Sequence, residues 1–291
     1  MKFTFIRDNR DKFDVCVMCV MCRILEVTDT GFYAWLIRPE SDRTVRTREL
    51  SEQIRVVHHE SHGIYGSIKV THELAHRKHV ANRKTIAKLM AKLGIRSKVS
   101  KKFRVQTTDS NHANPVAPNT LNRKFASATA PNQIWSTDIT YLQTDEGFLY
   151  LAGVMDLYSR KIVGWSMDDT MTTKLVENAL NAALSTRKNV VGILHHSDRG
   201  VQYTSSRYRE LLDLHGVRVS MSRTGNCYDK AVVESFWGKL KMEMAYHRRF
   251  ATKAEAKAAV FEYIEMFYNR KRLYAALGYL SPEQFEMSQK R

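Results

Sequence analysis

The 291-residue sequence has few of the features that stabilise secreted proteins or anchor proteins in membranes. It contains four cysteines, and three of them lie in one short segment, which does not make a disulfide framework. No run of about 18 uninterrupted apolar residues is present that could cross a bilayer. The charged residues Arg7 and Asp8 interrupt the first segment, which therefore lacks the apolar core of a secretory signal peptide. We therefore expect a cytoplasmic protein of about two domains, with no membrane partner.

Acidic residues are also scarce relative to basic ones. The sequence contains 30 Asp and Glu residues and 46 Lys and Arg residues, which gives a net charge of +16. The excess is concentrated in the first 125 residues, which hold 24 basic and 12 acidic residues; Lys69 to Arg104 holds 12 basic residues and one acidic residue, Glu73. Such a density repels itself unless a polyanion lies nearby, so nucleic acid is the expected partner. A solvated basic face without a ligand is the alternative.

Two segments of this basic half have helix-turn-helix spacing. Residues 15–37 predict two short helices around a break at Val27–Gly31. The second unit is stronger: Ser67 is expected to cap one helix, Asn82 to cap the next, and Gly94 to end it. In that last helix apolar residues recur at positions 86, 89, 90 and 93, and the basic residues Arg83, Lys84, Lys88 and Lys92 mostly populate the other side. A basic helix packed on a partner helix suits the DNA major groove, although a simple helical hairpin has the same pattern.

The second half of the chain predicts a mixed α/β layer. Residues 105–131 hold three of the five prolines and read as a linker. The segments that follow are β-rich runs at 134–141, 148–156 and 161–167, a helix at 173–187, an apolar strand that starts at 190–194 and ends at Asp198, a helix at 205–215, a short strand at 217–219, a helix at 229–245 and an amphipathic helix at 253–269. Three strands joined by short turns indicate an antiparallel meander, and the later alternation indicates an α/β sheet.

Three acidic residues in this half project from regular elements into apolar surroundings. Asp138 lies on the polar side of an alternating strand, Asp198 ends the apolar strand, and Glu234 lies in a helix beside Phe236 and Trp237. Grouping three carboxylates would raise their pKa values steeply unless cations bound between them. Mg²⁺ prefers such oxygen ligands, and two ions held roughly 3.5–4 Å apart support phosphoryl transfer. The three residues are therefore candidate catalytic residues and metal ligands.

Each acid also has an ordinary structural explanation. Asp138 is compatible with a half-exposed strand facing solvent, and Asp198 with capping the next turn. Glu234 is compatible with an ion pair to Lys230 or Lys241 on its own helix. From the residues alone, these explanations and the metal site stay open.

The blocks Trp135–Thr140, His196–Gly200 and Asp229–Phe236 resemble the three catalytic blocks of bacterial insertion-sequence transposases with a retroviral-integrase-like core. Asp198 and Glu234 are separated by 35 residues, the spacing typical of this Asp-Asp-Glu superfamily. Lys241, seven residues after Glu234, matches the family's basic residue that contacts the element's end. The resemblance covers essentially the whole chain and is greatest to the downstream-frame product of the IS-three group.

The resemblance implies an RNase H-like catalytic core, preceded by a helical helix-turn-helix region and followed by a C-terminal helix. It also implies Mg²⁺ or Mn²⁺, two ions in number, and metal-dependent cleavage at insertion-sequence ends followed by 3′-hydroxyl strand transfer. The expected partners are double-stranded DNA, both inverted-repeat ends and target, and an upstream-frame helix-turn-helix and leucine-zipper protein or fusion. A homo-oligomer on DNA, associated with the bacterial nucleoid, is implied as well.

The expected domains are a helical segment (1–45), a basic DNA-binding domain (46–104), a linker (105–130), the catalytic core (131–247) and a helical extension (248–291). Expected DNA contacts are Lys241, Lys230, Arg83, Lys84, Lys88 and Lys92. Two alternatives stay open: a catalytically impaired DNA-binding regulator, and an RNase H-like nuclease without joining activity.

Two features depart from the family pattern. Lys230 stands where the family usually has asparagine, and at four residues before Glu234 it is expected either to draw that glutamate away from a metal or to contact a phosphate. Residues 16–22 read like a duplicated Cys-Val-Met unit, which would rotate the following helical face by about 300°. Zinc binding by Cys16, Cys19 and Cys22 is a weak alternative to their packing as small hydrophobic residues.

Overall fold

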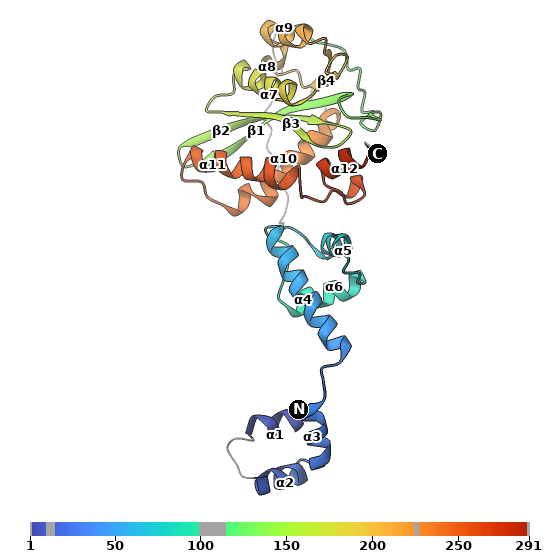
Figure 1. Ribbon diagram of the computed structural model, residues 1–291. Helices are drawn as coiled ribbons and strands as arrows, with labels where there is room; N and C mark the ends of the chain where they lie inside the picture. The colour runs from blue at the N-terminus through green and yellow to red at the C-terminus, as the bar shows by residue number, and fades with distance from the viewer. Residues whose placement is uncertain (1, 10–14, 99–114, 224–226, 290–291) are drawn as a thin grey trace. The chain divides into compact units, whose positions relative to one another are not determined.

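The computed structural model describes residues 2–9, 15–98, 115–223 and 227–289 (Figure 1). The chain divides into two compact units, Met1–Ile54 and Arg55–Arg291. Within the described ranges, no helix is both long and apolar enough to cross a bilayer.

The first unit consists of short helices around a small apolar core. Its elements are α1 (Lys2–Asn9), α2 (Val15–Ile24), α3 (Asp29–Ile37) and the first part of α4 (Asp42–Glu60). Ile6, Met18, Cys22 and Phe32 form the core, and the Thr28 hydroxyl caps α3 by accepting from the Gly31 amide at 3.1 Å. The predicted pair α2 and α3 is confirmed. Helix α1 was not predicted.

The second unit begins with the remainder of α4 and a basic helical pair, α5 (Ser67–His76) and α6 (Arg83–Lys92). The Asn82 side chain accepts from the Lys84 amide at 2.8 Å, and Gly94 takes a φ of +68° after the helix, as predicted. The prediction that Ser67 caps α5 is wrong by one position: the N-cap is Gly66, and Ser67 is the first helical residue. The large apolar side chains of α6, Ile86, Leu89 and Met90, are buried, and its basic ones are exposed.

A five-stranded sheet in the order β3-β2-β1-β4-β5 forms the centre of the second unit. Its strands are β1 (Ile134–Thr144), β2 (Gly147–Asp156), β3 (Ile162–Asp168), β4 (Leu194–Ser197) and β5 (Arg218–Met221). The first three form the predicted antiparallel meander, and β4 pairs in parallel with both β1 and β5. The predicted mixed α/β layer is confirmed.

Helices cover both faces of this sheet (Figure 1). Helices α7 (Thr173–Thr186), α8 (Val201–Thr204) and α9 (Ser206–Leu214) lie on one side, and α10 (Ala231–Glu243) and α11 (Lys253–Phe261) on the other. Two glycines show how closely the layers pack. A Cβ on Gly164 would lie 2.4 Å from backbone atoms of Ala179 and Ala183 in α7, and a Cβ on Gly153 would lie 2.8 Å from the Trp237 ring in α10. The polar face of β1 is therefore buried, contrary to what its alternating sequence alone suggests.

Three differences from the predicted elements have local causes. The predicted strand from residue 190 to Asp198 is confirmed only at Leu194–Ser197, which forms β4: Val191 is 82% exposed, and Gly192, with a φ of +82°, turns the chain before the strand begins. The first two residues of the predicted helix 229–245 belong to a separate 3₁₀ turn, η2 (Cys227–Lys230), and α10 begins after them. The predicted helix 253–269 continues after α11 as a π-helical segment, η4 (Glu262–Tyr268). Helix α12 (Pro282–Ser288) was not predicted.

The described part of the predicted linker packs against the sheet. Residues 115–130 contain neither helix nor strand, as expected, but Leu121 is buried. The amides of Thr120 and Leu121 donate to the Ser220 hydroxyl, and Asn119 donates to Asp229 at 2.8 Å. This segment is therefore attached to the sheet at residues 119–121; residues 105–114 lie outside the described residues.

A buried polar cluster fixes the far end of α10. Glu243 accepts hydrogen bonds from the Arg272 Nε at 2.7 Å and from the Tyr263 hydroxyl at 2.8 Å. Next to Arg272, the Tyr65 hydroxyl donates to the Lys271 carbonyl and accepts from the Leu273 amide. The basic helical pair and the C-terminal segment are thus joined by hydrogen bonds through Tyr65.

The close approach of β3 and α7 predicts a large effect of Gly164→Ala. The added methyl group would overlap backbone atoms that cannot rotate away, so we expect unfolding free energy to fall by at least about 3 kcal/mol, measured by denaturant titration. Gly238→Ala is the control, because nothing lies within 4 Å of that Cβ position in α10 and alanine favours helix by about 1 kcal/mol. Equal effects of the two substitutions would contradict this packing.

Asp229 predicts a pH-dependent contribution to stability. Burial raises the pKa of Asp229, but hydrogen bonds from Arg223 and Arg123 outweigh it and hold the pKa well below 3.8. Its contribution is therefore present at neutral pH and lost progressively as the pH falls below 3.8. We expect Asp229→Asn to cost about 2 kcal/mol at pH 7, less as the pH falls, in denaturant titrations at several pH values. The exposed Asp213→Asn should change stability by less than about 0.5 kcal/mol.

Candidate active site

Parallel pairing of β1 with β4 brings Asp138 and Asp198 together. The last paired residues of the two strands are Ser136 and His196, and each aspartate lies two positions further along its own chain. Asp138 is opposite Gly153 in β2, so its side chain lies on the sheet face that α10 covers. Asp198 follows the end of β4, where its Oδ1 accepts from the Gly200 amide at 2.9 Å. The two aspartates thus meet just beyond the last residue pair that joins β1 to β4, Asp138 within β1 and Asp198 directly after β4.

The Lys230 ammonium lies between these two carboxylates. Its Nζ donates to Asp138 Oδ1 at 2.8 Å and to Asp198 Oδ2 at 2.9 Å. The three residues are buried, with exposed fractions of 8% for Asp138, 7% for Asp198 and 6% for Lys230. The site therefore consists of two acceptor carboxylates converging on one cation.

This arrangement corrects the expectation that Lys230 pairs with Glu234. Lys230 belongs to η2 and is the N-cap of α10, so the four-residue helical spacing does not bring the two side chains together. Its ammonium is buried and bonds to two aspartates, and the expected contact of Lys230 with a phosphate stays a prediction. The sequence shows a lysine inside a catalytic block, but it does not show that Asp138 and Asp198 are the partners of that lysine.

Glu234 lies in the first turn of α10, half-buried and within electrostatic range of the pair. Burial raises the pKa of Glu234, and the charge of Asp138 raises it further. In the part of the chain that the structure describes, no three His, Cys, Asp or Glu side chains lie close enough to hold a metal ion together. Asp138 and Asp198 are brought together, then, and Glu234 is near them without completing a three-ligand cluster.

Burial and neighbouring charges have opposing effects on the pKa values of Asp138 and Lys230. Burial raises the pKa of Asp138, Lys230 opposes that rise, and the neighbouring Asp198 adds to it. Burial would lower the pKa of Lys230, but the two aspartates more than offset this and raise it. The donor set fits a hard cation: carboxylate oxygens from Asp138 and Asp198 already converge on a positive charge, and Glu234 supplies a third nearby carboxylate.

Asp229 positions Lys230 from the preceding residue. Its buried carboxylate accepts from the Arg223 amide and Nε, at 3.0 and 3.1 Å, and from the Arg123 Nε at 3.0 Å. Together with Asn119, these donors fix η2 to the segment before β1 and to the end of β5. Sequence reasoning missed this role, because the donors lie 6 to 110 residues away along the chain.

The two histidines before Asp198 are structural. His195 Nε2 is 3.0 Å from the Tyr208 hydroxyl, and His196 Nδ1 is 2.9 Å from the Ser220 hydroxyl. Burial lowers the pKa of His195 to about 3 and that of His196 to about 4, so both are neutral near pH 7. They do not converge with Ser197 as a nucleophilic triad would.

The expected DNA contacts fall in two places. Lys241 lies on α10 with its Nζ 4.7 Å from the centroid of the Tyr141 ring; burial lowers the pKa of Lys241, and the Asp138 charge opposes this. The other contacts are exposed on α6, namely Arg83, Lys84, Lys88 and Lys92. Of the three N-terminal cysteines, Cys22 is buried in the apolar core and Cys19 is exposed; the Cys16 side chain lies outside the described residues.

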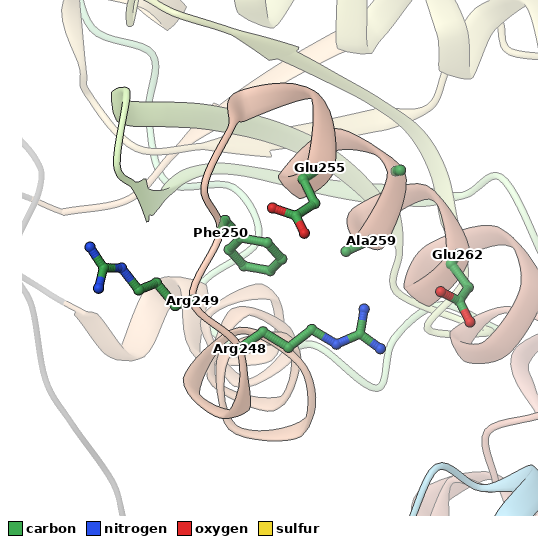
Figure 2. A pocket seen from close by; sticks show the side chains of 7 residues that line it. Arg248, Arg249, Phe250, Glu255, Ala259 and Glu262 are labelled. Carbon is green, nitrogen blue, oxygen red and sulfur yellow. The ribbon is translucent and has the colours of Figure 1, made fainter.

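A cavity of about 520 Å³ lies apart from the carboxylates, between the loop at Arg248–Phe250 and α11. Figure 2 shows Phe250 and Glu255 lining it, with Arg248 pointing toward Glu262 and Arg249 pointing away. Arg249 forms an ion pair with Asp145 on the β1–β2 turn. None of the candidate catalytic residues lines this cavity.

Solved structures similar to this chain include retroviral integrases. The catalytic core of HTLV-2 integrase in complex with magnesium, trimeric form, is 16% identical, covers 55% of this chain and 99% of its own, and has a TM-score of 0.42. An intasome of simian T-cell lymphotropic virus bound to a PP2A regulatory subunit is also 16% identical, covers 80% of this chain and 74% of its own, and has a TM-score of 0.46.

Family models and sequence relatives match nearly the whole chain. An HTH-like domain matches residues 46–103, and integrase core domain models match residues 128–227 and 234–289. The 31 kDa protein of insertion element IS600 from Shigella sonnei is 45% identical over 90% of this chain and 96% of its own length. The transposase InsF of IS3A from Escherichia coli is 41% identical over 98% of both chains, and the IS904 transposase of Lactococcus lactis is 43% identical over 86% and 98%. With this agreement along its length, the chain belongs to the IS3 family of DNA transposases, with an HTH-like domain before an RNase H-like integrase core.

Proposed function

We propose that Asp138, Asp198 and Glu234 are the catalytic carboxylates with which this transposase cuts DNA at the ends of its insertion sequence and joins the new 3′-hydroxyl to a target. The observation that carries the proposal is the convergence of two buried aspartates on one cation, just beyond the residues through which β1 and β4 pair in parallel. The half-buried Glu234 faces them from α10. Buried carboxylates grouped in this way are costly without a function for them.

The three carboxylates are proposed to hold Mg²⁺ or Mn²⁺, two ions in all. When bound, such ions activate a water or hydroxyl nucleophile and stabilise the leaving oxygen of an in-line displacement. The protein's own contribution is positional: β1 and β4 fix the two aspartates on the rigid sheet, and α10 brings Glu234 from the covering layer. A donor set made of carboxylate oxygens supports this choice of ion.

The exposed basic face of α6 is proposed as the main contact to the inverted-repeat ends. Its apolar side is buried against its neighbours, which leaves Arg83, Lys84, Lys88 and Lys92 available to meet phosphates or base edges. Lys241 is proposed to hold the same end near the carboxylates, since its ammonium is within electrostatic range of Asp138.

We propose a separate role for each of five segments of the chain. Residues 46–104 bind DNA, 131–247 catalyse, 105–130 connect the two, and 1–45 and 248–291 are helical extensions. Joining two element ends to a target brings several DNA segments together, which supports a homo-oligomer on DNA at the bacterial nucleoid. A partner or fused product from an upstream reading frame, carrying a further helix-turn-helix and a zipper, completes the proposed assembly.

Substitution of the carboxylates tests the catalytic assignment. We expect Asp138→Asn, Asp198→Asn and Glu234→Gln each to reduce Mg²⁺-dependent cleavage of an end duplex by at least about a hundredfold, because each removes a charged oxygen ligand. Joining of a pre-cut 3′-hydroxyl end should fall equally, which separates transposition from simple hydrolysis. Glu210→Gln, an exposed change on α9, is the control and should leave both activities intact. Undiminished activity of the Asp138 variant would disprove the assignment.

Salt dependence tests the DNA-binding face. Replacing both Lys84 and Lys88 by alanine should weaken binding to an end duplex and lower the slope of log K against log salt by about 2, because each phosphate that a lysine neutralises adds roughly 0.9 to that slope. Fluorescence anisotropy at several salt concentrations measures this slope. Lys257→Ala removes an exposed charge on α11 and should leave the slope unchanged. An unaltered slope in the double variant would show that α6 does not bind the phosphates.

A further inference from the structure

The Lys230 ammonium occupies the space between Asp138 and Asp198. It donates to one oxygen of each carboxylate, at 2.8 and 2.9 Å, and all three side chains are buried. Two buried carboxylates less than about 6 Å apart repel each other strongly in a medium of low polarity, so they need a positive charge between them to stay ionised. In this structure the chain supplies that charge itself.

A divalent ion bound by both aspartates would need the same place. Mg²⁺ lies about 2.0–2.1 Å from its oxygen ligands, and an ammonium hydrogen-bonded to both Asp138 Oδ1 and Asp198 Oδ2 leaves no room for it. A single and a double positive charge side by side in a buried site would also repel each other strongly. Occupation by Lys230 and occupation by a shared metal ion therefore exclude one another.

We infer that Lys230 is a built-in counter-cation that holds Asp138 and Asp198 together when no divalent ion is bound, and that it must withdraw before one binds. This inference rests on the proposed function, because it concerns the same carboxylates. Lys230 is thus a positioning residue that lowers the apparent metal affinity of the site and keeps the metal-free aspartates in their working arrangement.

The anchoring of Lys230 permits this exchange. Its backbone is held in η2 through the neighbouring Asp229, which is bonded to Arg123, Arg223 and Asn119. The ammonium itself ends a flexible four-carbon stem, so it can leave the aspartates by rotation about side-chain bonds while η2 stays in place. The withdrawal therefore needs no rearrangement of the sheet or of α10.

Metal binding by the full-length protein tests the inference without reference to catalysis. Mn²⁺ is titrated into the wild type and into Lys230→Asn, and free Mn²⁺ is followed by its electron paramagnetic resonance signal. We expect Lys230→Asn to bind Mn²⁺ at least tenfold more tightly. Lys239→Asn is the matched control: it removes the same charge from α10, the helix that Lys230 precedes, but its ammonium bonds to Ser235 and Tyr274 instead, so affinity should change by less than about threefold.

Thermal unfolding provides a second readout. Without metal, Lys230→Asn should melt several degrees below the wild type, because it leaves two buried carboxylates without their counter-ion, and saturating Mg²⁺ should raise its melting temperature more than that of the wild type. Lys230→Met, which keeps the length of the stem without its charge, should behave in the same way. It separates loss of charge from any local disturbance caused by the shorter asparagine.

The outcomes distinguish this inference from the proposed function. Equal Mn²⁺ affinity in the wild type and both Lys230 variants, or an equal gain in Lys239→Asn, would overturn the counter-cation role while leaving the carboxylate site intact. Failure of every variant to bind Mn²⁺, together with full cleavage activity of Asp138→Asn, would overturn both.

Discussion

The structure of the catalytic unit depends on burying charge between two tightly packed layers. Strand β1 lies at the centre of the sheet with helices on both faces, so the polar side chains from Ser136 to Thr140 are buried. Asp138 is tolerated there because it shares a cation with Asp198, which the parallel pairing of β1 and β4 brings alongside it. The active site thus depends on strand order, and strand order depends on the helix α7, which connects β3 to β4 and packs against the sheet at Gly164.

Much of the fold could be predicted from hydrophobic patterning and capping residues. The β1–β3 meander and the amphipathic helix α6, capped by Asn82 and ended by Gly94, follow from local rules that act over a few residues. The predictions that were wrong concern places where local preference and tertiary context disagree. The chain turns at Val191 and Gly192, before β4, because Gly192 adopts a positive φ. The expected linker is held to the sheet by Asp229 and Ser220, which lie about 100 residues further on.

The candidate site was predictable to a similar degree. Sequence patterns and family resemblance selected Asp138, Asp198 and Glu234, and the strand pairing explains why the first two meet. The position of Lys230 was not predictable, because a helical spacing of four residues assumes that both residues belong to one continuous helix. A 3₁₀ turn ends at Lys230 and α10 begins after it, and the ammonium bonds to the two aspartates instead of Glu234. One break in helical geometry therefore changes which acid the lysine neutralises.

The contact between Gly153 and Trp237 fixes how deeply α10 settles onto the sheet. Because the indole lies where a side chain at 153 would be, the bare backbone of β2 sets the height of the helix above β1. Glu234, one turn before Trp237, rises or falls with that height relative to Asp138 on the neighbouring strand. The missing methyl group at Gly153 therefore governs the distance between the Glu234 and Asp138 carboxylates, although β2 itself contributes none of the three acids.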